Sequence, residues 1–320
     1  MIYKAAILTS GGDAPGMNAA VRAVVRYAAQ LGVAVQGVCR GYEGLLRQES
    51  FPLSIRGVGG IIHRGGTLLK TARCEDFKHG WAQREAVEYL RSLDIDCLFV
   101  IGGDGSLKGA QALSRLGFPT ITIPGTIDND MPGTQYTLGF DTALNTVLDA
   151  ASRIRDTAYS HERVAIVEVM GRNAGYIALY AGLACGAEYT LLPEYPADLE
   201  AVCAGLMESH KTGKLSSIVI VAEGAASGAE VQKYIQEHTY LETNLTVLGY
   251  IQRGGAPTAR DTITAALFAR KAVDAAVSGT MNVVVGEING HTVLTPYHEV
   301  DKYTYHIDRK LYDLVTLLGR

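Results

Sequence analysis

Residues 3–18 read YKAAILTSGGDAPGMN, and this stretch sets the pattern that the rest of the chain follows. The short apolar run at residues 3–8 indicates a β-strand, and the glycine-rich break Ser10-Gly11-Gly12-Asp13 ends it. A helical pattern then begins near residue 17. A strand, a tight turn and a helix in this order form the first half of a βαβ unit, so the stretch predicts an α/β protein.

The same alternation continues along the whole chain. Strands are expected at residues 3–8, 33–39, 97–101, 120–123, 164–169, 217–222, 246–250 and 283–287. Helices are expected near residues 17–31, 81–93, 107–116, 140–157, 174–185, 198–211, 229–238 and 258–277. This rhythm is typical of parallel sheets that are buried on both faces. The length of 320 residues suggests about two such domains.

Composition narrows the classes of function. Apolar residues make up 48% of the chain, enough for a sizeable core, and the net charge of −4 argues against nucleic acid or an anionic membrane as a partner. The five cysteines are scattered without a CxxC pair, which is typical of free thiols in a reducing compartment. The sequence begins without a signal-peptide pattern, and its longest small and apolar stretch, residues 176–187, is too short to span a bilayer. We therefore expect a cytoplasmic protein.

Four glycine-rich breaks directly follow predicted strands. They are Ser10-Gly11-Gly12-Asp13, Gly102-Gly103-Asp104-Gly105, Pro124-Gly125-Thr126-Ile127-Asp128-Asn129-Asp130 and Met170-Gly171-Arg172. In open α/β sheets ligands bind at the carboxyl ends of the strands. We therefore expect all four breaks to gather along one crevice.

The first two breaks have features of phosphate-binding turns. Glycine lets the backbone approach an anion closely, and the start of the next helix offers unpaired N–H groups. In the second break, Asp104 adds a carboxylate, which Mg²⁺ prefers together with nucleotide phosphates. The first break matches neither the Walker A loop nor GxGxxG. The alternatives are a turn that only needs glycine and an aspartate that caps a helix beginning near Ser106.

The third break carries two carboxylates, Asp128 and Asp130. Phosphoryl transfer depends on positioning, on charge neutralisation and on a group that accepts the proton of the attacking hydroxyl. We expect the two aspartates to point the same way in an extended segment, one as base and one tuning it. The alternative is a solvated acidic turn.

Basic and acidic side chains elsewhere complete the set. Arginines beside glycines or small polar residues, able to grip phosphate through two parallel bonds, are Arg73, Arg163, Arg172 and Arg253. Glu223 follows the strand predicted at 217–222 and either accepts hydrogen bonds from sugar hydroxyls or caps the next turn. The sequence has no HExxH or GxSxG motif, which argues against zinc hydrolysis and serine-nucleophile chemistry.

Six motifs together resemble the bacterial ATP-dependent 6-phosphofructokinases. They are TSGGDAPGMN at 9–18, GGT at 65–67, GGDGS at 102–106, PGTIDND at 124–130, VEVMGR at 167–172 and GYIQRGG at 249–255. GGDG also occurs in NAD and lipid kinases, whereas PGTIDND with MGR and IQRGG is highly specific. Because the motifs follow the family's order over essentially the whole chain, the sequence is identified as a member of this family.

The resemblance implies a role for each matching position. The residues that would bind ATP are Gly12, Arg73, Cys74, Gly103, Asp104, Gly105 and Ser106, with Asp104 also holding Mg²⁺. The residues that would bind fructose 6-phosphate are Thr126, Ile127, Asp128, Arg163, Met170, Gly171, Arg172, Glu223, Asn244, Tyr250 and Arg253. Asp128 would take the proton of the sugar's 1-hydroxyl, with Thr126 and Asp130 beside it. Arg73 and Arg172 would neutralise charge near the transferring phosphoryl group and the sugar phosphate.

The resemblance also implies a regulated homotetramer. Arg163 would reach into the neighbouring subunit's site and hold the 6-phosphate with Arg253, and Glu162 beside it would offer the opposite charge as subunits rotate. Positions that match the family's site for ADP or phosphoenolpyruvate are Arg22, Arg26, Arg155, Gly186, Glu188 and Lys214. Ile55, Gly60 and Thr212 replace polar or charged family residues there.

Four further positions bear on the choice of substrate. Gly105 stands where pyrophosphate-dependent relatives carry Asp, and Gly125 stands where they carry Lys, so both favour ATP as the donor. Asn244 replaces a family arginine and Tyr250 a family histidine at the sugar phosphate. These two departures predict weaker sugar-phosphate binding or a shifted sugar preference, with the chemistry intact.

The implied fold is two doubly wound, Rossmann-like α/β domains facing across a cleft. Residues 1–138 with 251–305 would form the larger, ATP-binding domain, and residues 139–250 with 306–320 the smaller, sugar-phosphate-binding domain. The implied activity is phosphorylation of fructose 6-phosphate by ATP and Mg²⁺ in glycolysis. A kinase for another sugar phosphate, such as tagatose 6-phosphate, and a non-catalytic nucleotide-sensing paralogue stay open as alternatives.

Overall fold

The structure is a computed structural model that describes residues 2–304 and 306–319. The chain divides into two compact units, unit 1 with residues 1–142 and 253–305 and unit 2 with residues 143–252 and 306–320. The chain therefore crosses between units at 142/143, 252/253 and 305/306, where the sequence analysis placed the crossings at 138/139, 250/251 and 305/306. Within the described residues, no helix combines the length and the apolar character needed to cross a membrane.

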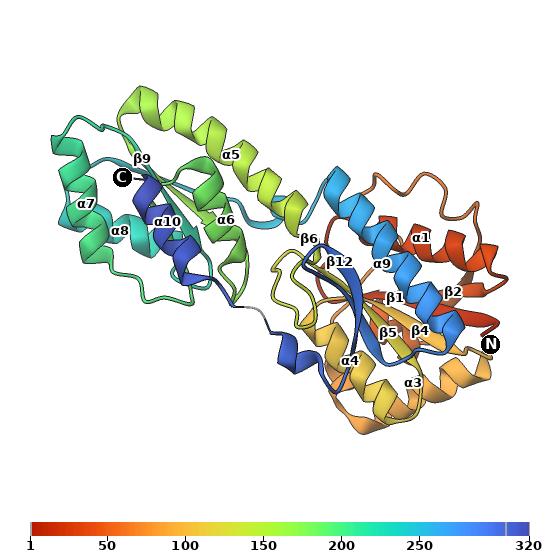
Figure 1. The fold of residues 1–320 in the computed structure, drawn as a ribbon. Coiled ribbons are helices and arrows are strands. Elements are labelled where there is room, and N and C mark those ends of the chain that lie inside the picture. The colour runs from red at the N-terminus through yellow and green to blue at the C-terminus, as the bar shows by residue number, and fades with distance from the viewer. Residues whose placement is uncertain (1, 305, 320) are drawn as a thin grey trace. The chain divides into compact units, whose positions relative to one another are not determined.

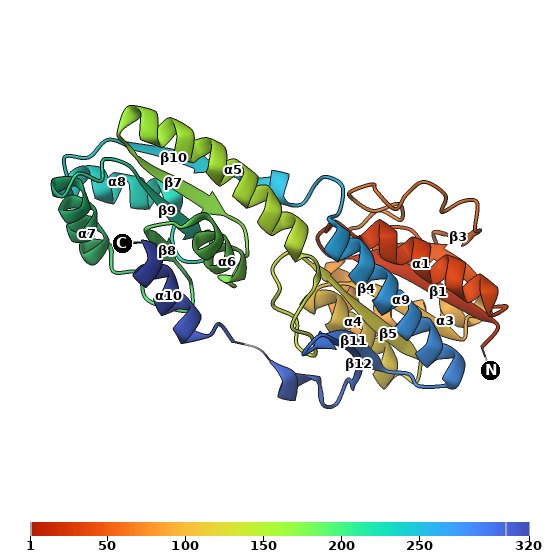
Figure 2. The ribbon, with the colours of Figure 1, turned by 45° about the horizontal axis from the view of Figure 1, so that its top comes forward.

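Unit 1 is built on one mixed sheet. Its strand order is β12-β11-β5-β4-β1-β2-β3, with β6 beside β5 (Figures 1 and 2). The strands are β1 Lys4–Ser10, β2 Ala34–Val38, β3 Ser50–Leu53, β4 Cys97–Gly102, β5 Thr120–Thr126, β6 Leu138–Gly139, β11 Val283–Ile288 and β12 His291–Pro296. The strands from β2 to β11 run parallel to their neighbours, whereas the edge strands β3 and β12 are antiparallel to β2 and β11.

Helices cover both faces of this sheet. They are α1 Met17–Gln30, α2 Gly41–Leu46, α3 Gly80–Ser92, α4 Asp104–Arg115 and α9 Ala259–Ser278, with 3-10 turns η1 Glu75–Lys78 and η3 Val300–Tyr303. Helices α1 and α9 pack side by side on one face, and α3 and α4 lie on the other (Figures 1 and 2). As a result every residue of β4 and β5 is buried, as expected for a parallel sheet between two helix layers.

Unit 2 repeats the architecture on a smaller scale. Its strands, β7 Val164–Val169, β8 Tyr189–Leu191, β9 Ser217–Ala222 and β10 Thr243–Val247, form a fully parallel sheet in the order β10-β7-β9-β8. Its helices are α5 Phe140–His161, of which residues 140–142 belong to unit 1, α6 Tyr176–Cys185, α7 Leu199–Lys211, α8 Gly228–His238 and α10 Arg309–Gly319, with the 3-10 turn η2 Gly249–Gln252. The expected fold class, two doubly wound α/β domains, is confirmed.

The fold differs from the sequence-based expectation in two ways. The strand expected at 246–250 lies at Thr243–Val247 instead, because Gly249 takes a φ of 52° and the chain turns into η2. The short strands β3, β6, β8 and β12 and the helices α2 and α10 were not expected. Among them, β12 follows a hairpin whose turn residues Asn289 and Gly290 have φ values of 50° and 76°. Asn-Gly is a strong signal for such a turn, so this antiparallel strand was readable from the sequence.

Candidate active site

The carboxyl ends of β1 and β4 meet where the strand order of unit 1 reverses. From β1 the chain continues outward to β2, whereas β4 leads in the opposite direction to β5. Ser10 pairs with Gly102 in register, so the first two glycine-rich breaks start at the same level. Such a reversal point is where open α/β sheets bind ligands.

These two breaks pack closely enough to require glycine. A Cβ at Gly102 would overlap the Oγ of Ser106, which is buried. Gly11 has a φ of 84°, and its carbonyl oxygen accepts a hydrogen bond from Thr71 Oγ1 at 2.6 Å. The glycines therefore let two turns lie against each other at the strand ends.

Helix α4 begins directly after the second break. Gly103 is the residue before its first turn, and no side chain caps the helix. Asp104 therefore does not serve as the cap of a helix starting near Ser106, as the alternative interpretation had it. Its carboxylate is 44% exposed and pairs with Lys108 Nζ at 2.6 Å. The site of a Cβ on Gly105 has no atom within 4 Å, so open space adjoins the positive end of the helix.

Tyr42 anchors this helix start, although no sequence motif marked it as a functional residue. Its hydroxyl donates to the carbonyl oxygen of Ser106 at 2.6 Å, and its ring stacks on Phe77 with centroids 4.1 Å apart. Burial raises the pKa of Tyr42 well above its ordinary value, so the phenol stays a proton donor. Phe77 lies in η1, which directly follows Arg73 and Cys74; Arg73 is exposed, and burial raises the pKa of the Cys74 thiol.

The third break follows β5, the neighbour of β4. A Cβ on Gly103 would lie 3.4 Å from the Cβ of Thr126, so the second and third breaks are adjacent. Ile127 and Asp128 are buried, Asp128 being 7% exposed, and the backbone N–H of Asp128 donates to Thr126 Oγ1 at 3.2 Å. Helix start and buried carboxylate thus belong to one corner of unit 1.

The expectation of an extended segment with two parallel aspartates is wrong. The chain bends at Ile127 and Asp128, and Asn129 takes a left-handed φ of 55°. The side chain of Asn129 stabilises this turn because its Oδ1 accepts a hydrogen bond from the backbone N–H of Thr137 at 2.8 Å. Asp128 is therefore buried whereas Asp130 is exposed, and the two carboxylates have different surroundings.

The fourth break, Met170-Gly171-Arg172, belongs to unit 2 and not to the strand ends of unit 1. Gly171 and Arg172 have φ values of 143° and 57°, and a left-handed conformation costs a non-glycine residue about 1–2 kcal/mol. Glu223 offsets this cost, since its Oε1 accepts hydrogen bonds from the backbone N–H groups of Gly171 at 3.3 Å and Arg172 at 2.8 Å. Glu223 thus holds a neighbouring loop, a contact that neither interpretation of its role had foreseen.

The remaining candidates for the sugar site are divided between the two units. In unit 2, Arg163 Nε pairs with Glu242 Oε2 at 2.7 Å, Asn244 is exposed on β10, and Tyr250 is 82% exposed on η2. In unit 1, Arg253 NH1 donates to the carbonyl oxygen of Asp13 at 3.2 Å, beside Gly12. Arg253 is thus held at the first glycine-rich break.

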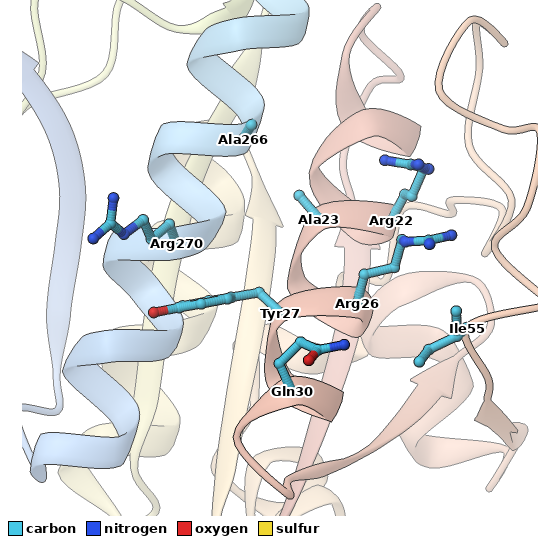
Figure 3. A pocket seen from close by; sticks show the side chains of 8 residues that line it. All are labelled: Arg22, Ala23, Arg26, Tyr27, Gln30, Ile55, Ala266 and Arg270. Atoms are coloured by element: carbon cyan, nitrogen blue, oxygen red, sulfur yellow. The ribbon is translucent and has the colours of Figure 1, made fainter.

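The effector candidates also divide between the units. Arg22 and Arg26 on α1 line a pocket of about 370 Å³ together with Ala23, Tyr27, Gln30, Ile55, Ala266 and Arg270 (Figure 3). In unit 2, Lys214 Nζ contacts the buried Glu188 at 2.8 Å and the carbonyl oxygen of Gly319 at 2.8 Å. Arg155 NH2 donates to the carbonyl oxygens of Cys185, at 2.5 Å, and Gly186, at 3.1 Å.

The donor groups near α4 suit Mg²⁺ bound together with a nucleotide. Over residues 2–304 and 306–319, no three His, Cys, Asp or Glu side chains come together as a protein-only metal cage. Mg²⁺ instead uses one or two carboxylates plus substrate phosphates, and Asp104 offers one exposed carboxylate beside the open space at Gly105. Asp104 and the open space beside Gly105 therefore suit Mg²⁺ that is bound together with a nucleotide.

Comparison with known proteins shows the family to which the chain belongs. Residues 4–276 match the family model described as Phosphofructokinase. An ATP-dependent 6-phosphofructokinase of Clostridium botulinum (strain Loch Maree / Type A3) is 50% identical over 315 residues, 98% of this chain and 99% of that protein. One of Halalkalibacterium halodurans is 51% identical over 308 residues, 96% of this chain and 97% of that protein.

Solved structures that resemble this chain include other phosphofructokinases. The Pichia pastoris phosphofructokinase in the T-state aligns with a TM-score of 0.89 at 35% identity and covers 94% of this chain, which spans only 35% of the Pichia chain. A pyrophosphate-dependent phosphofructokinase from Marinobacter aquaeolei shares the fold, with a TM-score of 0.84 at 23% identity over 99% of this chain and 91% of that chain. The chain belongs to the phosphofructokinase family.

Proposed function

We propose that the chain transfers the γ-phosphoryl group of ATP to the 1-hydroxyl of fructose 6-phosphate, giving fructose 1,6-bisphosphate and ADP in glycolysis. The observation that carries this proposal is that Gly103, which precedes Asp104 at the start of α4, lies against Thr126, two residues before the buried Asp128. The curated relatives at 50% and 51% identity are both named ATP-dependent 6-phosphofructokinase.

Unit 1 would bind the nucleotide. The start of α4 offers backbone N–H groups and a positive dipole end to phosphate, and Gly105 leaves room beside them. Residues proposed for this site are Gly12, Arg73, Cys74, Gly103, Asp104, Gly105 and Ser106. When bound, Mg²⁺ held by Asp104 would neutralise charge on the phosphates of ATP.

Asp128 would be the proton acceptor. As the 1-hydroxyl oxygen forms its bond to the γ-phosphorus, the hydroxyl proton passes to the Asp128 carboxylate and the bond to the ADP oxygen breaks. Thr126 stabilises the bend before Asp128, and Asp130, being exposed, keeps a secondary role in our proposal. Arg73 and Arg172 would neutralise charge near the phosphoryl groups.

Replacing the base tests this assignment. Asp128→Asn keeps the size and removes the proton acceptor, so kcat should fall about 10²- to 10⁴-fold with KM for ATP little changed. Asp149→Asn is the matched control, because Asp149 is 67% exposed on α5 and pairs with Arg153 in the next turn. An Asp128→Asn enzyme with the kcat of the wild type would sink the proposed mechanism.

Unit 2 would bind the sugar phosphate. The residues proposed to bind the sugar phosphate are Met170, Gly171, Arg172, Glu223, Asn244, Tyr250 and Arg163 in unit 2, and Thr126, Ile127, Asp128 and Arg253 in unit 1. Because Asn244 and Tyr250 depart from the family, a kinase for another sugar phosphate such as tagatose 6-phosphate is the second candidate. A coupled assay of the purified chain with several sugar phosphates, and with ATP or pyrophosphate, decides between them and detects a non-catalytic chain.

Assembly and regulation form a separate part of the proposal. We propose a cytoplasmic homotetramer in which Arg163 serves the neighbouring subunit, and in which ADP or phosphoenolpyruvate acts as effector. The proposal of an anionic effector is supported by the pocket on α1, because Arg22 and Arg26 are among the residues that line it (Figure 3). Sugar-phosphate saturation curves that do not move with ADP or phosphoenolpyruvate would contradict the regulatory part alone.

A further inference from the structure

The side-chain amide of Gln252 joins two backbone segments of unit 2. Gln252 is completely buried. Its Oε1 accepts a hydrogen bond from the backbone N–H of Met170 at 3.2 Å, and its Nε2 donates to the carbonyl oxygen of Gly249 at 3.1 Å. One side chain therefore connects the loop after β7 to the turn η2.

The loop after β7 depends on such contacts, because it cannot continue as a strand. Gly171 and Arg172 both have positive φ values, so their N–H groups turn away from the sheet ladder. Three consecutive N–H groups are instead bound by two side chains, that of Met170 by Gln252 and those of Gly171 and Arg172 by Glu223. Gln252 and Glu223 together set the direction in which the exposed Arg172 leaves the loop.

The position of Gln252 in the chain adds a second constraint. The chain passes from unit 2 to unit 1 immediately after Gln252. The next residue, Arg253, is held in unit 1 by its hydrogen bond to the carbonyl oxygen of Asp13. Two adjacent side chains thus anchor this crossing, each in its own unit.

We infer that Gln252 is a positioning residue for sugar-phosphate binding. It acts through the backbone of Met170 and Gly249, and its complete burial keeps it from touching the substrate itself. Loss of its acceptor would release the first N–H of the loop that presents Arg172, weakening the grip on the substrate phosphate. The inference rests on the proposed function, in which Arg172 binds the sugar phosphate.

The test compares two substitutions at this position. Gln252→Met has a similar volume and no hydrogen-bonding group, so KM for fructose 6-phosphate should rise about tenfold, the effect of one lost hydrogen bond. KM for ATP, whose proposed site is in unit 1, should stay within about twofold of the wild type. Gln252→Glu keeps an acceptor for the Met170 N–H and should show a smaller rise in KM for fructose 6-phosphate.

Gln36→Met is the matched control. The side-chain amide of Gln36 on β2 donates to Ser50 Oγ on β3 at 3.0 Å, and neither residue belongs to a proposed site. Its variant should keep the wild-type KM for both substrates, with thermal unfolding measured for all variants. A merely structural role for Gln252 would lower the unfolding temperature and the active fraction but leave KM unchanged.

The wild-type enzyme is assayed first, so that the two proposals fail separately. A wild type inactive on every sugar phosphate sinks the proposed function. An active wild type whose Gln252→Met variant keeps its KM overturns the role of Gln252 alone. If neither Gln252 variant folds, Gln252 is a structural residue and the inference is likewise overturned.

Discussion

The guanidinium group of Arg253 lies against Gly12, where its NH1 nitrogen donates to the carbonyl oxygen of Asp13 at 3.2 Å. A Cβ on Gly12 would overlap that same nitrogen. The first glycine-rich break is therefore closely packed against an arginine that lies 240 residues after Asp13 in the sequence. Glycine here serves the close approach of a cation as well as the tight turn.

Gly12→Ala should impair binding more than folding. The overlapping atom is the far end of a flexible side chain, so the guanidinium can move aside and the free energy of unfolding should fall by less than about 1 kcal/mol. Displacing Arg253 should raise KM for fructose 6-phosphate about tenfold or more, by loss of a charge-assisted bond. Gly254→Ala is the control, because a Cβ there meets no atom within 4 Å. Equal kinetics for the two variants would contradict the assignment of Arg253.

Gly105→Asp should weaken the use of ATP as phosphoryl donor and leave the fold intact. A Cβ at Gly105 meets no atom within 4 Å, and an acidic residue in the first turn of α4 suits the helix dipole. The added charge would repel the phosphates of ATP, so kcat/KM for ATP should fall at least about tenfold with little change in melting temperature.

Gly125→Lys should lower the melting temperature, because Gly125, unlike Gly105, is tightly packed. A Cβ at Gly125 would lie 3.1 Å from both Ile101 Cγ2 and Met17 Cε in the buried end of β5. Overpacking of this kind costs about 1–3 kcal/mol, so this variant should melt at a lower temperature than Gly105→Asp. If Gly105→Asp melted at a lower temperature than Gly125→Lys, the packing that the structure gives around Gly105 and Gly125 would be contradicted.

Restoring the family residues should tighten sugar-phosphate binding. Asn244 and Tyr250 are both exposed, so Asn244→Arg and Tyr250→His should not disturb the core. Each would add a hydrogen bond from a group able to carry positive charge, and KM for fructose 6-phosphate should fall about tenfold or more. An unchanged KM in steady-state assays of the double variant would end the idea that these two positions weaken binding.

Asp261 makes stability depend on pH. It is completely buried at the start of α9 and accepts hydrogen bonds from Gly139 N at 3.0 Å, Thr142 N at 2.9 Å and Thr142 Oγ1 at 2.5 Å. Burial raises the pKa of Asp261 above its ordinary value of 3.8, although these three donors oppose the rise. Because folding favours the protonated form, the stabilisation is complete below pH 3.8 and is lost as pH rises through the raised pKa.

Asp261→Asn removes this titration. The excess stability of the wild type over the variant should be largest near pH 3.8 and should decline to a constant as pH rises above the raised pKa. Above that pH the variant should still lose about 1.5–3 kcal/mol, since an amide nitrogen then faces backbone donors. Chemical denaturation of both proteins across this range measures the difference, and one that grows with pH would refute the sign.

Local patterns sufficed for most of the elements. The apolar runs at β1, β4, β5, β7 and β9 are buried on both faces, so composition alone marks them as strands. The edge strands β3 and β12 are half exposed and alternate weakly, which is why they were missed despite the Asn-Gly turn before β12. The residue types at the strand ends also indicated phosphoryl transfer before any contact was known.

Sequence alone determined the α/β class and, through its motifs, the phosphofructokinase family, and it predicted which strand ends carry the chemistry. Tertiary structure alone decided how those ends are held: Asp128 buried and Asp130 exposed around the left-handed Asn129, Glu223 and Gln252 bound to the loop after β7, and Arg253 against Gly12. The reason is physical. Residue type and spacing set what a segment can do locally, whereas burial and hydrogen-bond partners depend on segments that are distant along the chain and meet only when the sheets form.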